Sequence, residues 1–387
     1  MLGFSTYAAL LPELRDLWRL SNSQAGIIGG MFFAGYIGTV SLWTALTYRL
    51  DARHVYLAGG VLAAAGSAGF AFLAEGFASA VLFQVVLGVG IAATYMPGLR
   101  LLSDRVSGRL QSRSIAFYTS FFGIGTALSL ALAGLVAPVW GWRMAFGVSA
   151  AGPLLAAILV VLLVDGSSAS GAQLRISLET LFPLSAWRKV LADRASAGYT
   201  LGYAAHCLEL FGSRAWMVAF LAYSSSLHLD GTFPWPAAAL AACVNLAAVP
   251  ASILGNEAAL RIGRRRWIVA VMAASGSSGI LLAFGAPWHW ALVLGLLVVY
   301  SMLVMAESGT LTAGLVAAAP AELRGAAMGL YSLVGFGGGM LGPVVFGAAL
   351  DAAGGAQSVW AWATAYAAIG AGCLLAPVVA RAYARAS

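Results

Sequence analysis

The chain has 387 residues, of which 61% are apolar and 9% are charged, and its net charge is +7. Soluble globular proteins carry roughly 25% charged residues, so this composition excludes a soluble enzyme, a disordered protein and a nucleic-acid-binding module. It indicates a polytopic membrane protein, because apolar segments of about 20 residues, each long enough to cross a ~30 Å hydrocarbon core, recur along the chain.

The first apolar segment, residues 1–13, is too short to cross the membrane, since about 13 helical residues reach only ~20 Å. We interpret it as the second half of a first helix whose beginning is missing. Full spans are predicted at 25–47, 54–74, 78–101, 114–138, 143–164, 196–224, 235–254, 267–286, 289–315, 325–349 and 357–380. The pattern therefore predicts an all-α membrane protein with twelve helices, the first of them truncated.

A polar segment, Asp165 to Arg194, divides these spans into two groups of six. We expect an N-terminal bundle at 1–165, a linker at 166–195 and a C-terminal bundle at 196–387. Weak motifs recur in the same order in both halves. For example, Arg113 is followed by the glycine pair Gly123 and Gly125, and Arg324 by the pair Gly335 and Gly337. This recurrence indicates an internal duplication of six-helix units.

The basic residues predict the orientation, because Lys and Arg gather in cytoplasmic loops. Most of the 21 Lys and Arg residues fall in the loops that follow predicted helices 2, 4, 8 and 10, in the linker that follows helix 6, or in the C-terminal tail. Only Arg15, Arg19 and Arg143 are placed on the opposite side. We therefore expect both termini in the cytoplasm and the protein in the cell membrane, such as the inner membrane of a bacterium.

Several motifs resemble those of the major facilitator superfamily of secondary transporters. Its loop 10–11 and helix 11 are similar to Arg324-Gly-Ala-Ala-Met-Gly329, Gly335-Phe-Gly-Gly-Gly339, Gly342-Pro343, Gly347 and Asp351. Its helix 5–6 hairpin and helix 1–2 loop are similar to Gly141-Trp-Arg-x-Ala-Phe146, Leu11-Pro-Glu-Leu-Arg15 and Ser21-Asn-Ser-Gln24. The resemblance implies two six-helix bundles with pseudo-two-fold symmetry, alternating access and no enzymatic activity.

The loops depart from the family pattern, in which an aspartate precedes the loop 2–3 arginine and can lock the inside closed. Tyr48 and Leu260 stand at that position. The basic gating candidates are retained, namely Arg49, Arg53, Arg113, Arg261, Arg264, Arg265 and Arg324. A gate would need another acid, with Asp51, Asp104 and Glu257 as candidates. Alternatively, these arginines only set the topology and bind anionic lipid headgroups.

Charged residues inside the spans are the candidates for transport, since a charge at mid-membrane costs at least ~2.5–3.5 kcal/mol. Only Glu209, Glu307 and Arg214 are predicted well inside, and His206 lies one turn from Glu209 on the same face. The resemblance places these residues on helices 7 and 10, which line the family's central cavity. Arg214 offers a planar fork to an anionic substrate. Either glutamate is a candidate proton carrier, because a low-dielectric cavity disfavours the charged carboxylate.

A structural alternative is a permanent ion pair between Arg214 and either glutamate. On a straight helix Glu209 and Arg214 point about 140° apart, so Glu307 is the expected partner unless the helix breaks at Gly212. Softer candidates are tyrosines on the presumed cavity helices, which more often serve packing than substrate binding: Tyr7, Tyr95, Tyr203 and Tyr300.

The sequence thus predicts a monomeric secondary transporter that moves a small polar or anionic organic solute with protons or another coupling ion. It predicts contact with membrane lipids, no nucleic acid, no metal, no cofactor and no catalytic residues, since neither a Walker sequence nor metal-ligand spacing is present. An efflux pump for amphipathic compounds is the alternative, with an aromatic cavity and a neutralised Arg214. A membrane-bound enzyme would need a His/Asp/Glu cluster at the membrane interface, and the sequence shows none. The duplicated single chain disfavours a channel.

Overall fold

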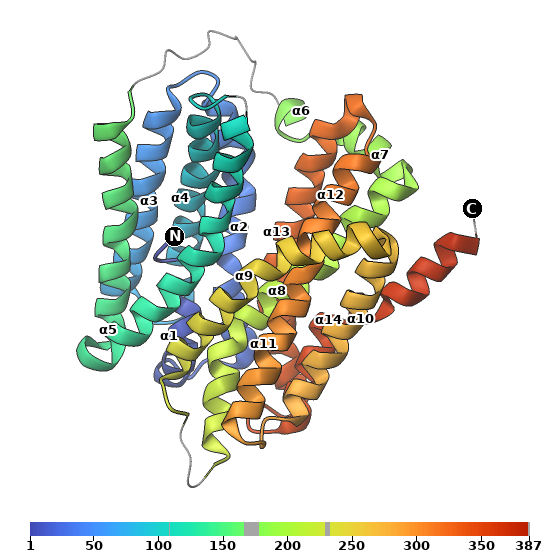
Figure 1. Ribbon diagram of the computed structural model, residues 1–387. Coiled ribbons are helices and arrows are strands. Elements are labelled where there is room, and N and C mark those ends of the chain that lie inside the picture. The colour runs from blue at the N-terminus through green and yellow to red at the C-terminus, as the bar shows by residue number, and fades with distance from the viewer. Residues whose placement is uncertain (108, 166–177, 229–232, 386–387) are drawn as a thin grey trace. The chain divides into compact units, whose positions relative to one another are not determined.

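The computed structural model describes residues 1–107, 109–165, 178–228 and 233–385, with some side chains between 109 and 120, at 178 and 180, and after 377 outside this description. Every regular element within these ranges is a helix (Figure 1). Nine stretches of the described residues are long and apolar enough to cross a membrane. The prediction of an all-helical membrane fold is therefore confirmed.

The first helices follow the predicted spans closely. They are α1 (Thr6–Leu17), α2 (Asn22–Leu46), α3 (Ala52–Leu73), α4 (Phe77–Ser103) and α5 (Arg109–Leu163). The long α5 is interrupted at Gly141, whose φ of 80° and ψ of 165° are not helical. A residue without a Cβ adopts this positive φ readily. Gly141 therefore separates the two spans predicted at 114–138 and 143–164.

The second half begins with two short helices inside the predicted linker and continues with long ones. They are α6 (Leu178–Leu181), α7 (Leu184–Ala192), α8 (Arg194–Ser226), α9 (Ala237–Ile262), α10 (Arg264–Phe284), α11 (Trp290–Ala306), α12 (Ser308–Ala318), η1 (Ala321–Leu323), α13 (Arg324–Ala352) and α14 (Val359–Arg385). The span predicted at 289–315 corresponds to Trp290–Ala318, one of the nine stretches, but its helix is interrupted at Glu307 between α11 and α12.

Contacts divide the chain into two compact units. The first comprises Met1–Leu10 and Met31–Pro183, and the second comprises Leu11–Gly30 and Leu184–Ser387. In the first unit α3 packs against α4 and α5 (Figure 1). In the second unit α8 packs against α13 and α14, and α10 packs against α14. The first turns of α2 thus belong to the second unit.

Glycines allow α2 and α13 to approach each other closely within the second unit. A Cβ at Gly26 would lie 2.2 Å from the carbonyl oxygen of Pro343, and one at Gly30 would lie 2.3 Å from that of Met340. In membranes, small residues at helix contacts let backbones pack at such short range. The close α2–α13 contact therefore depends on the absence of a Cβ atom at Gly26 and Gly30.

Asp351, near the C-terminal end of α13, caps the N-terminus of α2. Its carboxylate accepts hydrogen bonds from the backbone N–H of Asn22 at 3.1 Å and of Ser23 at 2.7 Å. It also accepts from the Asn22 amide at 2.8 Å, whose oxygen accepts from Arg15 at 3.1 Å. A carboxylate satisfies the free N–H groups of a helix start and complements its dipole, so α1, α2 and α13 are linked at these ends.

Candidate functional site

The second unit buries most of the charged residues that the sequence places inside the spans. His206 and Glu209 lie on α8 and are each 1% exposed, while Glu307, in the interruption between α11 and α12, is 0% exposed. Arg214, also on α8, is partly buried. These four residues occupy one unit, but they do not form a single cluster of mutual contacts.

Glu307 pairs with His206. The Nδ1 atom of His206 lies 3.0 Å from Oε1 of Glu307. The remaining polar atoms of the pair, Nε2 and Oε2, are buried and have no hydrogen-bond partner among the described residues.

Glu209 has different partners, although it lies on the same helix face as His206. The Ser275 hydroxyl on α10 lies 2.9 Å from its carboxyl Oε2 and 3.0 Å from the Met272 carbonyl. The Cys373 thiol on α14 is also within hydrogen-bonding reach of this carboxyl. No basic group lies within 4.0 Å of Glu209 in the described part of the chain. Sequence reasoning did not find Ser275 and Cys373 as neighbours of Glu209, because both lie far along the chain.

Arg214 forms neither of the ion pairs considered from the sequence. Its Nη2 atom donates to the Met305 sulfur at 3.5 Å, and thioether sulfur is a weak acceptor. Within the described ranges, no carboxylate lies within 4.0 Å of the guanidinium. Since α8 is one helix through Gly212, no break brings Glu209 to Arg214. The guanidinium therefore retains donors for another anion.

Two tyrosines support the His206 ring. Tyr203 on α8 stacks on Tyr331 of α13 with ring centroids 3.8 Å apart and an interplanar angle of 8°. The Tyr203 ring also lies beside that of His206, with centroids 5.6 Å apart and an interplanar angle of 21°. The Tyr331 hydroxyl lies 3.0 Å from the Thr312 hydroxyl on α12. Tyr331 and Thr312 were not predicted as site residues, although Tyr331 follows the motif at Arg324.

The other predicted tyrosines are in packing positions. Tyr300 is buried in the second unit and meets Tyr366 edge-on at 5.6 Å and 89°. In the first unit Tyr7 is buried beside Phe70, with ring centroids 6.2 Å apart. Tyr95 is partly buried, and its carbonyl accepts the Tyr118 hydroxyl at 2.7 Å.

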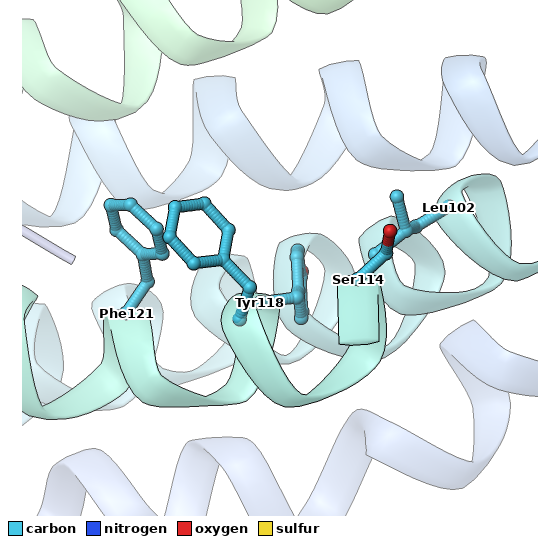
Figure 2. A pocket seen from close by; sticks show the side chains of 5 residues that line it. Leu102, Ser114, Tyr118 and Phe121 are labelled. Carbon is cyan, nitrogen blue, oxygen red and sulfur yellow. The ribbon is translucent and has the colours of Figure 1, made fainter. Parts of the chain in front are cut away.

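A pocket of about 520 Å³ lies in the first unit (Figure 2). Its walls come from α4 and α5 and consist of Leu102, Ser114, Phe117, Tyr118 and Phe121. Figure 2 shows Ser114, Tyr118 and Phe121 on consecutive turns of α5. Ligand pockets commonly have volumes of about 300–1,000 Å³ and apolar, aromatic walls, so the size and lining suit an apolar group.

The predicted gating residues lie at helix ends. Asp51 caps α3 by accepting the Arg53 N–H at 2.9 Å. The Arg53 guanidinium lies 4.0 Å from the Asp51 carboxylate and donates to the Val164 carbonyl at 3.2 Å, just after α5. Arg264 is partly buried, and the exposed ones are Arg49, Arg261, Arg265 and Arg324. The Arg113 side chain lies outside the described residues.

Comparisons with known proteins agree on one family. The family model described as Major Facilitator Superfamily matches residues 1–343. The chain is 28% identical to the Arabinose-proton symporter of Escherichia coli over 164 residues, 42% of this chain and 34% of that protein. It is 22% identical to Protein spinster homolog 1 of Homo sapiens over 221 residues, 56% of this chain and 42% of that protein.

The match to the Niacin transporter NiaP of Acinetobacter baylyi has 23% identity over 139 residues, 36% of this chain and 31% of that protein. The chain thus aligns with less than half the length of each of these curated relatives.

Solved structures share the fold over nearly the whole chain. A bacterial homologue of the human lysosomal transporter spinster, inward-facing and unoccupied, has a TM-score of 0.76 and 17% identity, covering 99% of this chain and 93% of that one. The nucleoside transporter NupG has a TM-score of 0.72 and 15% identity, covering 98% and 96%. At these identities the likeness concerns the fold.

Proposed function

Because the chain belongs to the Major Facilitator Superfamily, we propose that this multi-pass membrane protein is a secondary transporter driven by protons. It moves a small polar or anionic organic solute across the cell membrane by alternating access. Arg214 binds the solute and the His206–Glu307 pair carries the proton. The bundles 1–165 and 196–387 rock about the site, the linker and both termini are cytoplasmic, and the protein works as a monomer.

The state of Arg214 is the observation that carries this proposal. A guanidinium inside a membrane span is energetically unfavourable, and such residues usually serve a function. The Met305 sulfur is the only described polar contact of Arg214. Both buried acids of the second unit are engaged elsewhere, Glu307 with His206 and Glu209 with Ser275. An anionic solute group would accept hydrogen bonds from the guanidinium N–H groups that the described part of the chain leaves without an acceptor.

The His206–Glu307 pair suits a proton carrier for a chemical reason. An imidazole and a carboxyl in hydrogen-bonding contact can hold one proton between them, and these two side chains lie 3.0 Å apart. Gain or loss of one proton changes the charge of a buried pair, which favours one conformation of the protein over another. Two relatives support proton-driven transport of a small solute, since one is named a proton symporter and the other a niacin transporter.

Transport into liposomes tests the proposal. The purified protein is reconstituted and given an imposed pH gradient, with labelled nicotinate, L-arabinose and uridine as an anion and two neutral probes. We expect gradient-driven uptake of nicotinate. Arg214→Ala should raise the KM by about 10- to 100-fold, the effect of losing a charge-assisted contact, and Arg214→Lys should recover part of the loss. Arg188→Ala, which removes an exposed arginine on α7, is the matched control.

Two results would overturn separate parts of this account. Unchanged nicotinate uptake by Arg214→Ala would remove Arg214 from the binding site. Uptake by the wild type at the same rate with and without the gradient would exclude proton drive.

The pocket between α4 and α5 favours a second candidate, efflux of amphipathic compounds, because its lining is aromatic. In that case a cationic, amphipathic fluorescent dye such as ethidium should be expelled from liposomes. Phe121→Ala should slow its expulsion, while Arg214→Ala should leave it unchanged.

A further inference from the structure

The interruption between α11 and α12 lies directly beside the proton-carrying residue. α11 ends at Ala306, α12 begins at Ser308, and Glu307 between them has φ −93° and ψ −21°. Neither residue 306 nor 308 is a proline, so no proline ring blocks the helix at this point. A helix end leaves carbonyl groups without an intrahelical donor, and in a membrane these must find another partner.

The Ala306 carbonyl finds that partner on α10. The indole Nε1–H of Trp267 donates to this oxygen at 3.1 Å. On α9, Gly255 faces the same atom, because a Cβ at this position would lie 1.9 Å from the Ala306 oxygen. Below we call Trp267, Gly255 and the Ala306 carbonyl the α11–α12 brace.

The brace acts on Glu307 through a rigid group. The carbonyl of Ala306 and the N–H of Glu307 belong to the same peptide unit, which is planar. A hydrogen bond that holds the carbonyl therefore holds the whole peptide plane. The Cα of Glu307 lies in this plane, and the Glu307 side chain starts from it. The Glu307 side chain then reaches His206, with its carboxylate 3.0 Å from Nδ1.

We propose that Trp267 is a positioning residue of proton coupling, because its indole holds the Ala306–Glu307 peptide in the orientation that brings the Glu307 carboxylate to His206. This inference rests on the proposed function, in which Glu307 carries the proton. Trp267 itself touches neither solute nor proton.

Other titratable or charged groups act on Glu307, and its titration reflects them too. Those on the packed helices α8, α13 and α14 are His206, Cys207, Glu209, Tyr331 and Cys373, and Arg214 also lies on α8. α9 and α10 carry their charged residues toward the ends that meet at Gly263, namely Glu257, Arg261, Arg264, Arg265 and Arg266. None of these groups changes in the variants below, so a shift of the midpoint reports the brace.

Infrared spectroscopy of the protein in liposomes tests the proposal without a solute. The carbonyl stretch of a protonated carboxyl is followed against pH, and the band lost in Glu307→Gln is assigned to Glu307. In Trp267→Phe, which keeps the ring and removes the N–H, we expect the titration midpoint to move by about 0.5 to 1 pH unit, the equivalent of one net hydrogen bond. Trp362→Phe, which also removes an indole bond to a carbonyl, that of Ala356 at 2.9 Å, is the matched control and should leave the midpoint in place.

A second pair of variants tests the other side of the brace. Gly255→Ala should move the same midpoint, because its methyl group displaces the Ala306 carbonyl. Gly295→Ala on α11, where a Cβ has no neighbour within 4 Å, should not. If Trp267→Phe and Trp362→Phe titrate alike, or if Gly255→Ala and Gly295→Ala do, the positioning role is wrong. If Glu307→Gln removes no titrating band, the assignment of the proton to Glu307 fails instead.

Discussion

At the residue scale, the contact between His206 and Glu307 joins two side chains that are 101 residues apart in the chain. The sequence could place both inside spans, because charged and titratable residues are scarce there. It could not pair them, since helical periodicity relates only residues on the same helix. The alternative in which Arg214 pairs permanently with Glu307 is not what the structure shows, since the described polar contact of Arg214 is with the Met305 sulfur.

We predict that His206 and Glu307 stabilise the fold as a unit. His206→Ala leaves the Glu307 carboxyl buried without a partner, which should lower the free energy of unfolding by about 1–3 kcal/mol. Adding Glu307→Gln removes the charge and should restore part of this loss. Thermal unfolding in detergent, followed by tryptophan fluorescence, measures the cycle. Strictly additive effects of the two substitutions would mean that the contact contributes nothing.

At the scale of elements, the helix boundaries that carry a local signal were predictable and the others were not. Gly141 marks the turn within α5, and the residue type permits its positive φ. The interruption at Glu307 has only a weak local signal, Ser308–Gly309, because residues 300–306 are mostly apolar and continue a helical pattern. Trp267 on α10 and Gly255 on α9 contact it through the Ala306 carbonyl, and these are tertiary contacts.

Two glycines of α2 should respond differently to the same substitution. Gly26→Ala places a methyl group 2.2 Å from the Pro343 oxygen, and overpacking of this kind costs about 1–3 kcal/mol. Gly38→Ala has no neighbour within 4 Å and should be neutral or stabilising by up to ~1 kcal/mol, from helix propensity alone. Thermal unfolding in detergent compares the two. Equal shifts would show that the α2–α13 contact does not depend on Gly26.

At the scale of the whole molecule, hydropathy and the duplicated motifs predicted the helical architecture. Contacts then assign the hairpin Leu11–Gly30 to the second unit. Its first turns are held there by Asp351 and by the close approach of α13, so this assignment follows from residues more than 300 positions away. A sequence pattern read along the chain does not reveal such a contact.

The most direct test of the account is proton movement driven by the solute. Protein in liposomes that contain a pH-sensitive dye is exposed to a gradient of nicotinate, L-arabinose or uridine, with no pH difference imposed at the start. We predict that nicotinate causes proton flux through the wild type and none through Glu307→Gln, while labelled nicotinate still exchanges in that variant. Solute uptake by the wild type without proton movement, or the same proton flux in Glu307→Gln, would contradict it.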